Sequence, residues 1–435
     1  MKVLIVGSGG REHVLCWKIK QSKRVKKLYC APGNGGISQI ADCVDISAEN
    51  VGKLLEFAKK NKIDLTIVGP EAPLVLGIVD AFEKAGLTIF GPNQYAAQLE
   101  GSKVFAKEFL QRRNIPTASF QVFDDPEEAL SYLSKALLPV VVKADGLAAG
   151  KGVFVCHKQK EAQEAVGLIM KDKIFRDAGK RIVIEDCLSG EEVSILAIAD
   201  GENYLMLESS QDHKRIFDDD LGPNTGGMGA YSPAPVVNYD LLKKIETRVI
   251  EPTIRGMKRE GHPFKGVLYA GLMITSDGPM VLEYNVRFGD PETQAVLPRL
   301  QNDLLDVMLA ACEGELNKVK LKWDERNCVC VVLTSGGYPN KYDTGKEIIG
   351  LEKAQKLKDV LIFHAGTTKK DDKLLTCAGR VLGVVGLGDG VESAIKKAYG
   401  AVEQITFDHC FFRRDIGMKA LKRIAAKDFR NVAPL

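Results

Sequence analysis

The first hundred residues alternate short apolar runs with stretches of helical periodicity. Strand-like runs occur at 2–7, 26–34, 63–74 and 87–93. Helical patterns begin at Arg11 and near Ala81. Continuous apolar strands that alternate with helices are typical of a parallel sheet covered on both faces. This part of the chain is therefore predicted to form a doubly wound parallel-sheet domain of the α/β class.

The pattern changes near Ser102. A helical stretch there leads to two strand-like runs, 138–145 and 152–157, on either side of a glycine-rich loop. Residues 266–286 read as two strands around a turn at Ser276-Asp277-Gly278, which predicts a β-hairpin. The last hundred or so residues combine strand-like runs with a helix and predict a small α+β domain.

The second strand of that hairpin ends in an unusual concentration of charge, "LEYNVRFGDPETQ". A strand period of two places Glu283, Asn285 and Arg287 on one face. The opposite face is predicted to hold Leu282, Tyr284 and Val286. Carboxylate and amide oxygens suit Mg²⁺, and an arginine can hold a carboxylate or phosphoryl group through two bonds. The alternative is a half-exposed edge strand with polar residues facing water.

The segment Asp290-Pro291-Glu292 has the composition of a helix start. Asp290 is predicted as the N-cap, Pro291 as the first helical residue, and Glu292 as the acid of the first turn. Asp290 could serve both the cap and the neighbouring charged cluster.

The loop "GSGGREH" at 7–13 follows a strand and opens a helix, so its N–H groups could hold an anion. It departs from the dinucleotide-binding pattern, because Glu12 stands where the third glycine is required. A phosphate-bearing substrate is the favoured ligand. A tight turn without a ligand remains the alternative.

The loop "KADGLAAGKGV" at 143–153 resembles a nucleoside-triphosphate loop but lacks its spacing. Gly152 replaces the required Ser or Thr, and strands flank both sides, whereas that loop opens a helix. A glycine-rich hairpin can instead fold over phosphate oxygens, with Lys143 adding a point charge. A solvated surface hairpin is the weaker alternative.

The run "IEDCLSGEE" at 184–192 follows another predicted strand. Its backbone could meet the edge of an adenine, while a carboxylate accepts hydrogen bonds from ribose hydroxyls. Together with the glycine hairpin, this run indicates ATP.

Composition sets limits on the function. The formal net charge is +3 and is evenly spread, so the sequence indicates neither a nucleic-acid nor a membrane surface. No segment is as long as a membrane span. The ten cysteines form no CxxC pair, and Cys328 and Cys330 alternate along a strand-like run that favours a buried structural role. We expect a cytoplasmic protein with reduced thiols.

The order of a lysine-bearing strand, glycine hairpin, connecting segment and "E-x-N-x-R" strand resembles the ATP-grasp superfamily. Within it, the chain is similar to the glycinamide ribonucleotide synthetase family, also called phosphoribosylamine–glycine ligases. The motifs that support this similarity are "GSGGREH", "GPEAPL", "KADGLAAGKGV", "QDHKR", "GPNTGGMGAYSP", "RFGDPE", "GGYP" and "FRRDIG". They cover essentially the whole chain.

The resemblance implies three parts. These are a parallel-sheet substrate domain at 1–102, an ATP-grasp domain pair at 103–322 with a mobile lid at about 118–187, and a C-terminal domain at 323–435.

The resemblance also implies an activity. ATP would phosphorylate glycine, and 5-phosphoribosylamine would attack the glycyl phosphate to give glycinamide ribonucleotide, ADP and phosphate, the second step of de novo purine biosynthesis. We expect a monomer that needs ATP and Mg²⁺ or Mn²⁺.

Site residues follow from the same resemblance, position by position. The metal ligands would be Glu283 and Asn285, and the catalytic residues Arg287 and Asp290. The ATP-binding residues would be Lys103, Lys143, Gly150, Gly152, Glu185, Leu188 and Glu192. The substrate-binding residues would be Gly9, Gly10, Arg11, Asp212, Lys214, Arg215, Asn224, Gly226 and Gly227. Relatives often have a further metal-binding acid about a dozen residues before Glu283, where this chain reads "YAGLM".

Two alternatives remain open. A biotin-dependent or purine carboxylase of the same superfamily would activate bicarbonate in place of glycine, although "GSGGREH" and "GPNTGGMGAYSP" match the ligases. A nucleotide-binding regulator without turnover is disfavoured by the intact set of Lys143, Glu283, Asn285 and Arg287. His213 is a weak candidate for a general base, because a neutral amine can attack without one.

Overall fold

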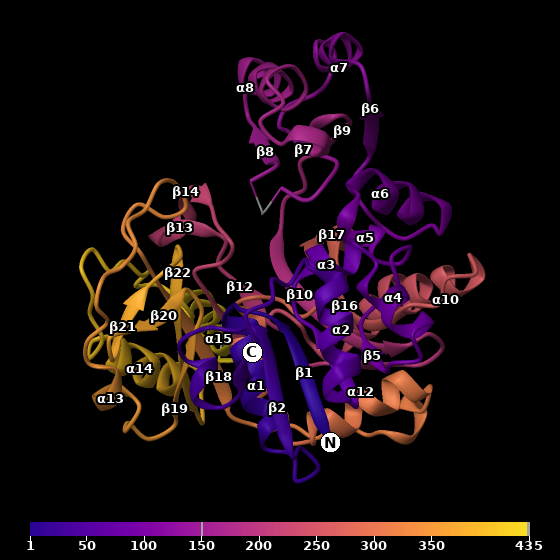
Figure 1. Ribbon diagram of the computed structural model, residues 1–435. Helices are drawn as coiled ribbons and strands as arrows, with labels where there is room; N and C mark the ends of the chain where they lie inside the picture. Colours follow the sequence, from indigo (N-terminus) through magenta and orange to yellow (C-terminus); the bar gives the residue numbers. More distant parts are fainter. Residues whose placement is uncertain (149–150, 433–435) are drawn as a thin grey trace.

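The computed structural model describes residues 1–148 and 151–432. Figure 1 shows a broad body formed by the two ends and the middle of the chain, with a smaller subdomain standing above it. Among the described residues, no helix is long and apolar enough to cross a membrane.

The N-terminal part is a five-stranded parallel sheet in the order β3-β2-β1-β4-β5. Its strands are β1 (Lys2–Gly7), β2 (Lys27–Pro32), β3 (Asp42–Cys43), β4 (Leu65–Val68) and β5 (Ile89–Phe90). The helices are α1 (Gly10–Lys20), α2 (Val51–Asn61), α3 (Glu71–Val75) and α4 (Ile78–Lys84). The predicted strands are all present, and the short β3 is additional.

Side chains of β1 alternate between two cores. Val3 and Ile5 pack in the same core as apolar residues of α1, whereas Leu4 and Val6 pack in the core that contains residues of α2 and α4. Because helices bury both faces of the sheet, the predicted doubly wound α/β arrangement is confirmed.

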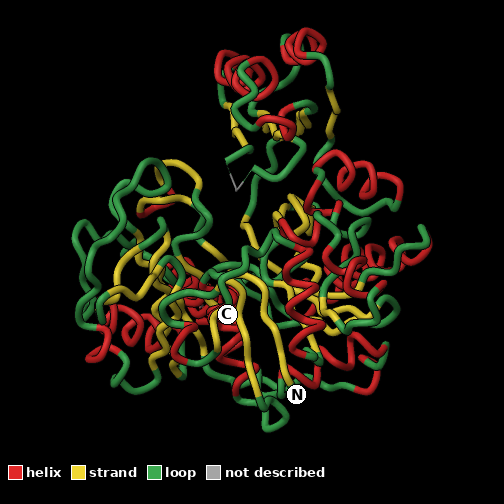
Figure 2. The backbone as a smooth tube through the Cα atoms, viewed as in Figure 1, coloured by secondary structure: helices red, strands yellow, loops and turns green. Residues whose placement is uncertain are grey.

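The subdomain at the top of Figures 1 and 2 contains a four-stranded antiparallel sheet, ordered β6-β9-β7-β8. It comprises β6 (Phe120–Phe123), α7 (Pro126–Leu133), β7 (Val140–Ala144), β8 (Val153–Cys156), α8 (Gln159–Val166) and β9 (Ile182–Asp186). This subdomain, which corresponds to the predicted lid at about 118–187 and is called the lid below, has a small hydrophobic core of its own. The predicted glycine hairpin joins β7 to β8, but Gly150 lies outside the described residues.

Below the lid, a second antiparallel sheet has the order β11-β10-β16-β17. The strands are β10 (Glu191–Asp200), β11 (Tyr204–Met206), β16 (Lys265–Thr275) and β17 (Gly278–Asn285). The helices nearby in sequence are α5 (Gln98–Gly101), α6 (Lys103–Arg112), α9 (Tyr239–Ile245), α10 (Glu251–Arg259) and α12 (Leu304–Glu313). The predicted hairpin is confirmed, with Gly278 at a φ of +115° just after the turn.

Strand β17 departs from strict alternation at one position. The register with β16 shifts between Gly271 and Leu272, so Leu282 is an extra residue on β17. The prediction that Leu282 faces away from the charged residues is therefore wrong, and Leu282 lines the same cavity as Glu283. Val286 is buried as predicted.

The C-terminal part is built on a five-stranded sheet, ordered β12-β15-β18-β22-β19, whose strands come from two separate regions of the chain. Two of its strands, β12 (Gln211–Asp212) and β15 (Gly229–Ser232), come from the middle of the chain. The others are β18 (Asn327–Thr334), β19 (Val360–His364) and β22 (Arg380–Gly388). Around them lie the hairpins β13 (Arg215–Phe217)–β14 (Leu221–Asn224) and β20 (Thr367–Lys370)–β21 (Lys373–Thr376), and the helices α13 (Leu351–Ala354), α14 (Val391–Val402) and α15 (Met418–Val432).

Cys328 and Cys330 are fully buried in β18, as predicted for structural residues. Burial raises the pKa of both thiols, which disfavours the reactive thiolate.

The expected helix start after β17 differs in detail. Helix α11 (Glu292–Val296) begins one residue later than predicted, with Pro291 at the N-cap position. Asp290 does not cap α11. Its Oδ2 instead accepts the backbone N–H of Arg11, at 3.1 Å, in the first turn of α1.

Candidate active site

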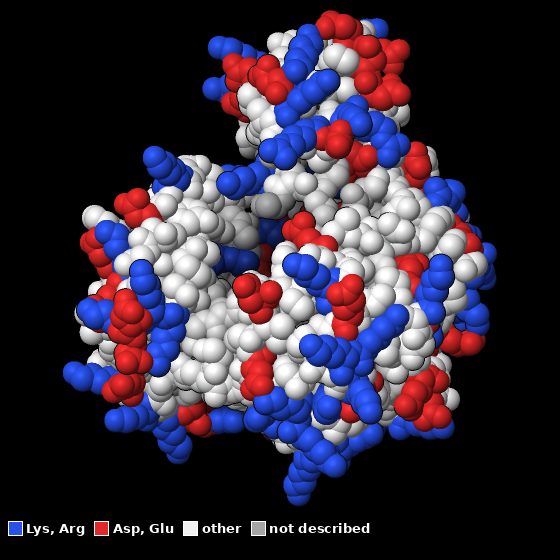
Figure 3. All heavy atoms as spheres, in the orientation of Figure 1, with Lys and Arg blue, Asp and Glu red and all other residues white. Residues whose placement is uncertain are grey.

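A cavity of about 1540 Å³ lies between the lid, the body and the C-terminal sheet. In Figure 3 it is a hollow below the lid, with Lys and Arg side chains visible inside. Most of the predicted site residues line it: Arg11, Lys103, Lys143, Gly152, Glu185, Leu188, Glu192, Asp212, Lys214, Arg215, Asn224, Gly226, Glu283, Asn285, Arg287 and Asp290. Gly9, Gly10 and Gly227 are outside its wall.

Strand β17 and the residues directly after it bring Glu283, Asn285 and Arg287 to the cavity. Arg287 Nη2 donates to Asn285 Oδ1 at 3.0 Å, so these two side chains lie on one face as predicted. The guanidinium also pairs with Glu100 at 2.8 Å and with Glu71 at 3.3 Å. Burial would lower the pKa of Arg287, but these carboxylates hold it above its ordinary value. Arg287 is therefore a fixed, permanently charged group.

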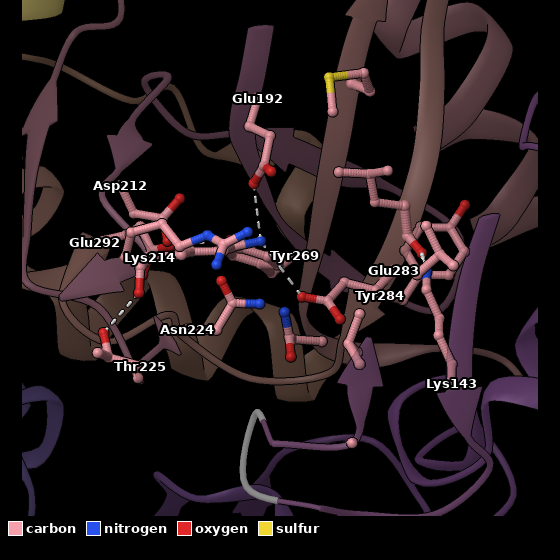
Figure 4. Close-up of a pocket in the computed structure, with 18 of the residues that line it drawn as sticks. Lys143, Glu192, Asp212, Lys214, Asn224, Thr225, Tyr269, Glu283, Tyr284 and Glu292 are labelled. Carbon is pink, nitrogen blue, oxygen red and sulfur yellow. Dashed lines mark hydrogen bonds and ion pairs between the residues drawn. The ribbon is translucent and has the colours of Figure 1, made fainter. Parts of the chain in front are cut away.

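The carboxylate of Glu283 faces a cation from the segment between β12 and β13. Lys214 Nζ lies 3.7 Å from Glu283 Oε1 and 3.1 Å from Glu192 Oε2. Dashed lines in Figure 4 mark these two ion pairs. Burial would raise the pKa of the Glu283 carboxyl, but Lys214, Lys143 and Lys103 hold it below its ordinary range. Glu283 is thus available as a charged oxygen ligand.

Asp212 lies beside this group on β12 (Figure 4). Burial raises its pKa to about 7, Lys214 opposes the shift, and the nearby carboxylates of Glu292 and Glu192 add to it. The cavity therefore contains a carboxyl group that can exchange a proton near neutral pH.

Two predicted phosphate-binding lysines lie on the lid side. Lys143 Nζ forms an ion pair with Glu185 and donates to the Leu282 carbonyl at 3.1 Å. Lys103 Nζ is 3.4 Å from the Gly146 carbonyl oxygen of the glycine hairpin. Burial lowers the pKa of Lys103. A bound polyanion would compensate this concentration of positive charge.

Two backbone N–H groups at the start of α1 already donate to carboxylates of the protein. Gly9 N donates to Glu12 Oε2 at 2.5 Å, and the N–H of Arg11 is held by Asp290. A Cβ atom on Gly10 would lie 2.6 Å from Gln294 Nε2. The N–H groups of Gly9 and Arg11 are thus directed to protein carboxylates, and from this loop Arg11 lines the cavity.

Asp290 connects all three parts of the chain. Besides its bond to α1, its Oδ1 accepts from Gln294 Nε2 at 2.8 Å and lies 3.2 Å from Arg380 Nη1. Burial would raise the pKa of Asp290, but the charges of Arg380 and Arg11 keep it below its ordinary value.

Sequence analysis missed several residues of the wall. Arg380 Nη1 donates to the Gly226 carbonyl at 2.6 Å, and Gly226 N donates to the Tyr338 hydroxyl at 2.9 Å. Tyr338 belongs to the quoted "GGYP" motif, so its motif was recognised but its role was not. Nothing in the local sequence around Arg380 distinguished it.

His213 is placed away from the cavity. It is buried, and neither ring nitrogen has a hydrogen-bond partner among the described residues. Burial lowers its pKa to about 3. A neutral imidazole outside the cavity wall is a poor candidate for a general base.

In the described part of the chain, no three His, Cys, Asp or Glu residues come together as a metal site. Glu283 and Asn285 nevertheless offer two hard oxygen donors at one strand end. This pair fits Mg²⁺ or Mn²⁺ if the remaining ligands come from nucleotide phosphates and water.

Comparisons with known proteins cover nearly the whole chain. Family models for the phosphoribosylglycinamide synthetase N domain, ATP-grasp (A) domain and C domain match residues 1–100, 101–293 and 328–419. Phosphoribosylamine–glycine ligase of Caldanaerobacter subterraneus is 51% identical over 416 residues, covering 96% of this chain and 99% of the relative. The chain belongs to the phosphoribosylglycinamide synthetase family.

This synthetase is therefore a carbon–nitrogen ligase of the ATP-grasp type, which forms glycinamide ribonucleotide in purine biosynthesis. The crystal structure of phosphoribosylamine–glycine ligase from Thermotoga maritima has a TM-score of 0.84 at 35% identity, covering 96% of this chain and all of that one.

The carboxylase alternative shares only the fold of the synthetase. A Campylobacter jejuni biotin carboxylase, solved as a β,γ-ATP complex, has a TM-score of 0.73 at 16% identity, covering 94% of this chain and 92% of that one. Family membership decides between the two in favour of the ligase.

Proposed function

We propose that the cavity binds ATP with Mg²⁺ or Mn²⁺ and transfers the γ-phosphoryl group to a carboxylate oxygen of glycine. The amine of 5-phosphoribosylamine then attacks the glycyl phosphate, forming the amide bond and releasing phosphate. The observation that supports this most is the convergence of Glu283, Asn285 and Arg287 with Lys103 and Lys143 on one cavity. Such a site catalyses by positioning and charge neutralisation, without a covalent nucleophile.

ATP is placed with its base beneath the lid. Leu188 and Glu185 would meet the adenine edge, and Glu192 would accept from ribose hydroxyls. Lys103 and Lys143 would hold the phosphates, covered by the glycine hairpin with Gly150 and Gly152. Lys143, which is paired with Glu185, and the partly buried Lys103 supply the positive charge that supports this orientation.

The metal ion is placed at Glu283 and Asn285. When bound, it would neutralise phosphate charge during transfer. Asn285 Oδ1 already accepts one bond from Arg287, and a carbonyl oxygen has a second lone pair for a metal.

Arg287 is placed at the acyl centre. Its fork would bind the carboxylate of glycine, and its contacts with Glu71 and Glu100 hold the side chain in position. Asp290 contributes by fixing Arg11 and Arg380 at the adjoining wall.

5-Phosphoribosylamine is placed on the side of the N- and C-terminal parts. Its phosphate and hydroxyls would meet the residues of these loops that line the cavity: Arg11, Asp212, Lys214, Arg215, Asn224 and Gly226. Gly9, Gly10 and Gly227 lie outside the cavity wall, so their contact with this substrate stays a prediction. Asp212 can take up a proton near neutral pH, so it is suited to a substrate that reacts as a free amine.

ADP formation tests this function directly. With freshly prepared 5-phosphoribosylamine, turnover should require glycine, Mg²⁺ and ATP together. Alanine and bicarbonate, each tested in place of glycine, are the controls. Turnover supported by bicarbonate and not by glycine would overturn the proposal.

We further propose that the protein is a cytoplasmic monomer, organised as 1–102, 103–322 and 323–435. Sedimentation at several protein concentrations tests the monomer, and fractionation of cells tests the location.

A further inference from the structure

Three buried charged side chains form a row at the inner end of the cavity. Lys107 of α6 and Lys143 of β7 each form an ion pair with Glu185 of β9, one with each carboxylate oxygen. The three side chains are 4%, 7% and 2% exposed, respectively. A single carboxylate is therefore shared between two cations. Lys107 has no part in the proposed mechanism above.

Lys107 and Lys143 are anchored differently. Lys107 Nζ donates to Thr117 Oγ1 at 2.6 Å, and Thr117 Oγ1 donates to the Val281 carbonyl at 2.6 Å. The ammonium also lies 5.8 Å from the ring centroid of Phe120. These contacts fix Lys107 between the body of the protein and strand β6 of the lid. Lys143, in contrast, is available to the nucleotide phosphates.

The surroundings of Glu185 suit a flat, apolar ring. Apolar side chains from five elements line the cavity together with Glu185: Ala106, Leu110, Val141, Val155, Met273 and Leu282. Next to Glu185, the backbone N–H of Leu188 donates no hydrogen bond within the described residues. A ring bound beside these residues would meet one donor, the N–H of Leu188, and one acceptor, the carboxylate of Glu185.

A 6-aminopurine matches that pair, because it presents a ring-nitrogen acceptor beside an amino donor. A 6-oxopurine presents the reverse, an N–H donor beside a carbonyl acceptor. The discrimination depends on the charge of Glu185, since a carboxylate only accepts, whereas a protonated carboxyl can also donate.

We propose that Lys107 is a specificity-determining residue, which keeps Glu185 as a carboxylate and so makes the cavity select ATP over 6-oxopurine triphosphates. The proposal rests on the placement of adenine at Glu185 and Leu188 in the proposed function. Lys107 acts through Glu185, so it is a positioning residue.

The electrostatics agree with this geometry. Burial would raise the pKa of Glu185, but Lys143 and Lys107 hold it below its ordinary value. The titratable groups that face Glu185 are Lys107 from α6, Lys143 from β7 and Cys187 from the segment after β9. Once Lys143 is shared with phosphates, Lys107 is the cation that remains with Glu185.

The test compares ATP with inosine triphosphate, a 6-oxopurine nucleotide, as substrates between pH 6 and 8.5. Wild type should prefer ATP by at least about 100-fold in kcat/KM, because a site built to accept a hydrogen bond rejects an analogue that lacks it. In Lys107→Met the preference should fall at least about tenfold. The KM for ATP should also rise as the pH falls, because the unsupported Glu185 takes up a proton.

Two variants serve as controls. Lys107→Arg keeps the charge and should retain the preference within a few-fold. Lys160→Met removes an exposed lysine of the lid, 85% exposed, and should behave as wild type. If Lys107→Met does not accumulate as folded protein, Lys107→Gln, which can still reach Thr117, gives the same measurement.

The variant Glu185→Gln distinguishes the placement of adenine at Glu185 from the proposed role of Lys107. If this variant leaves both the KM for ATP and the nucleotide preference unchanged, adenine does not lie at Glu185 and the proposed placement is wrong. If Glu185→Gln alters the preference, but the Lys107 variants change KM equally for both nucleotides at every pH, Lys107 is only structural and the inference is overturned.

Discussion

The guanidinium group of Arg287 lies 2.8 Å from the carboxylate of Glu100, and their side chains are 17% and 7% exposed. Glu100 belongs to α5, whereas Arg287 follows β17, so the pair joins distant parts of the chain. Glu100 Oε2 also accepts the N–H of Val286 at 2.7 Å. The arginine proposed for the acyl centre is thus held in place before any substrate arrives.

Replacement of Arg287 by lysine should depress the glycine-dependent rate while leaving the affinity for ATP within a few-fold. Lysine keeps the charge but loses the two-bond geometry toward a carboxylate. We expect a transition-state loss on the order of 2–4 kcal/mol, by analogy with removal of one oxyanion donor. Steady-state ADP formation at varied glycine measures it, with exposed Arg255→Lys as the control. A normal glycine-dependent rate would remove Arg287 from the acyl centre.

Glu100 should make stability depend on pH. Burial raises its pKa to about 7, against the opposing charge of Arg287. A carboxyl with a raised pKa in the folded state contributes stability below its unfolded pKa, and this contribution is lost as the pH rises through about 7. Relative to Glu100→Gln, wild type should lose roughly 2–3 kcal/mol of unfolding free energy between pH 4.5 and 7.5.

Urea unfolding of both proteins at several pH values measures this difference. A constant difference across the range would show that the carboxyl titrates as an ordinary exposed acid in the folded protein.

Glu283→Ala should abolish metal-dependent phosphate release while leaving the fold intact. The side chain is 36% exposed at a strand end, so little packing is lost. The rate should fall by orders of magnitude, because compensation of phosphate charge by a metal is worth several kcal/mol. Magnesium titration of ADP formation measures the loss, and exposed Glu313→Ala is the matched control. Near-normal turnover would exclude Glu283 as a metal ligand.

Asp290→Asn should lower stability by about 1–3 kcal/mol, since it removes the charge that pairs with the partly buried Arg380. The effect should appear as a lower midpoint in thermal unfolding. The exposed Asp343→Asn provides the comparison. Equal midpoints for the two variants would mean that the Asp290–Arg380 pair contributes nothing measurable.

The sequence predicted features that depend on local periodicity. It identified the strands of the N-terminal sheet, the β16–β17 hairpin and the common face of Asn285 and Arg287 because each follows from side-chain alternation. The bulge at Leu282 was missed, since it arises from pairing with Gly271 and Leu272 on β16.

Contacts between distant segments were beyond sequence reasoning. Asp290 was predicted to cap its own helix and to join the neighbouring charged cluster, but its bond to the N–H of Arg11 in α1, 279 positions earlier, was not foreseen. Arg380 and Glu100 went unnoticed for the same reason, because their roles depend on partners that only the tertiary fold brings close.

Strand β15, from the middle of the chain, pairs residue for residue with β18, from Gly229 opposite Val331 to Ser232 opposite Cys328. If the polypeptide chain were cut between β15 and β18, each fragment would carry one of the two paired strands with an unpaired edge. The fragments should then form active enzyme only when they are produced together. For the same reason, a chimera that takes its C-terminal segment from a relative should fold only if the β18 of that segment can pair with the β15 of the recipient chain. Substitutions in β15 and in β18 are therefore expected to be inherited together, although the two strands lie far apart in the sequence.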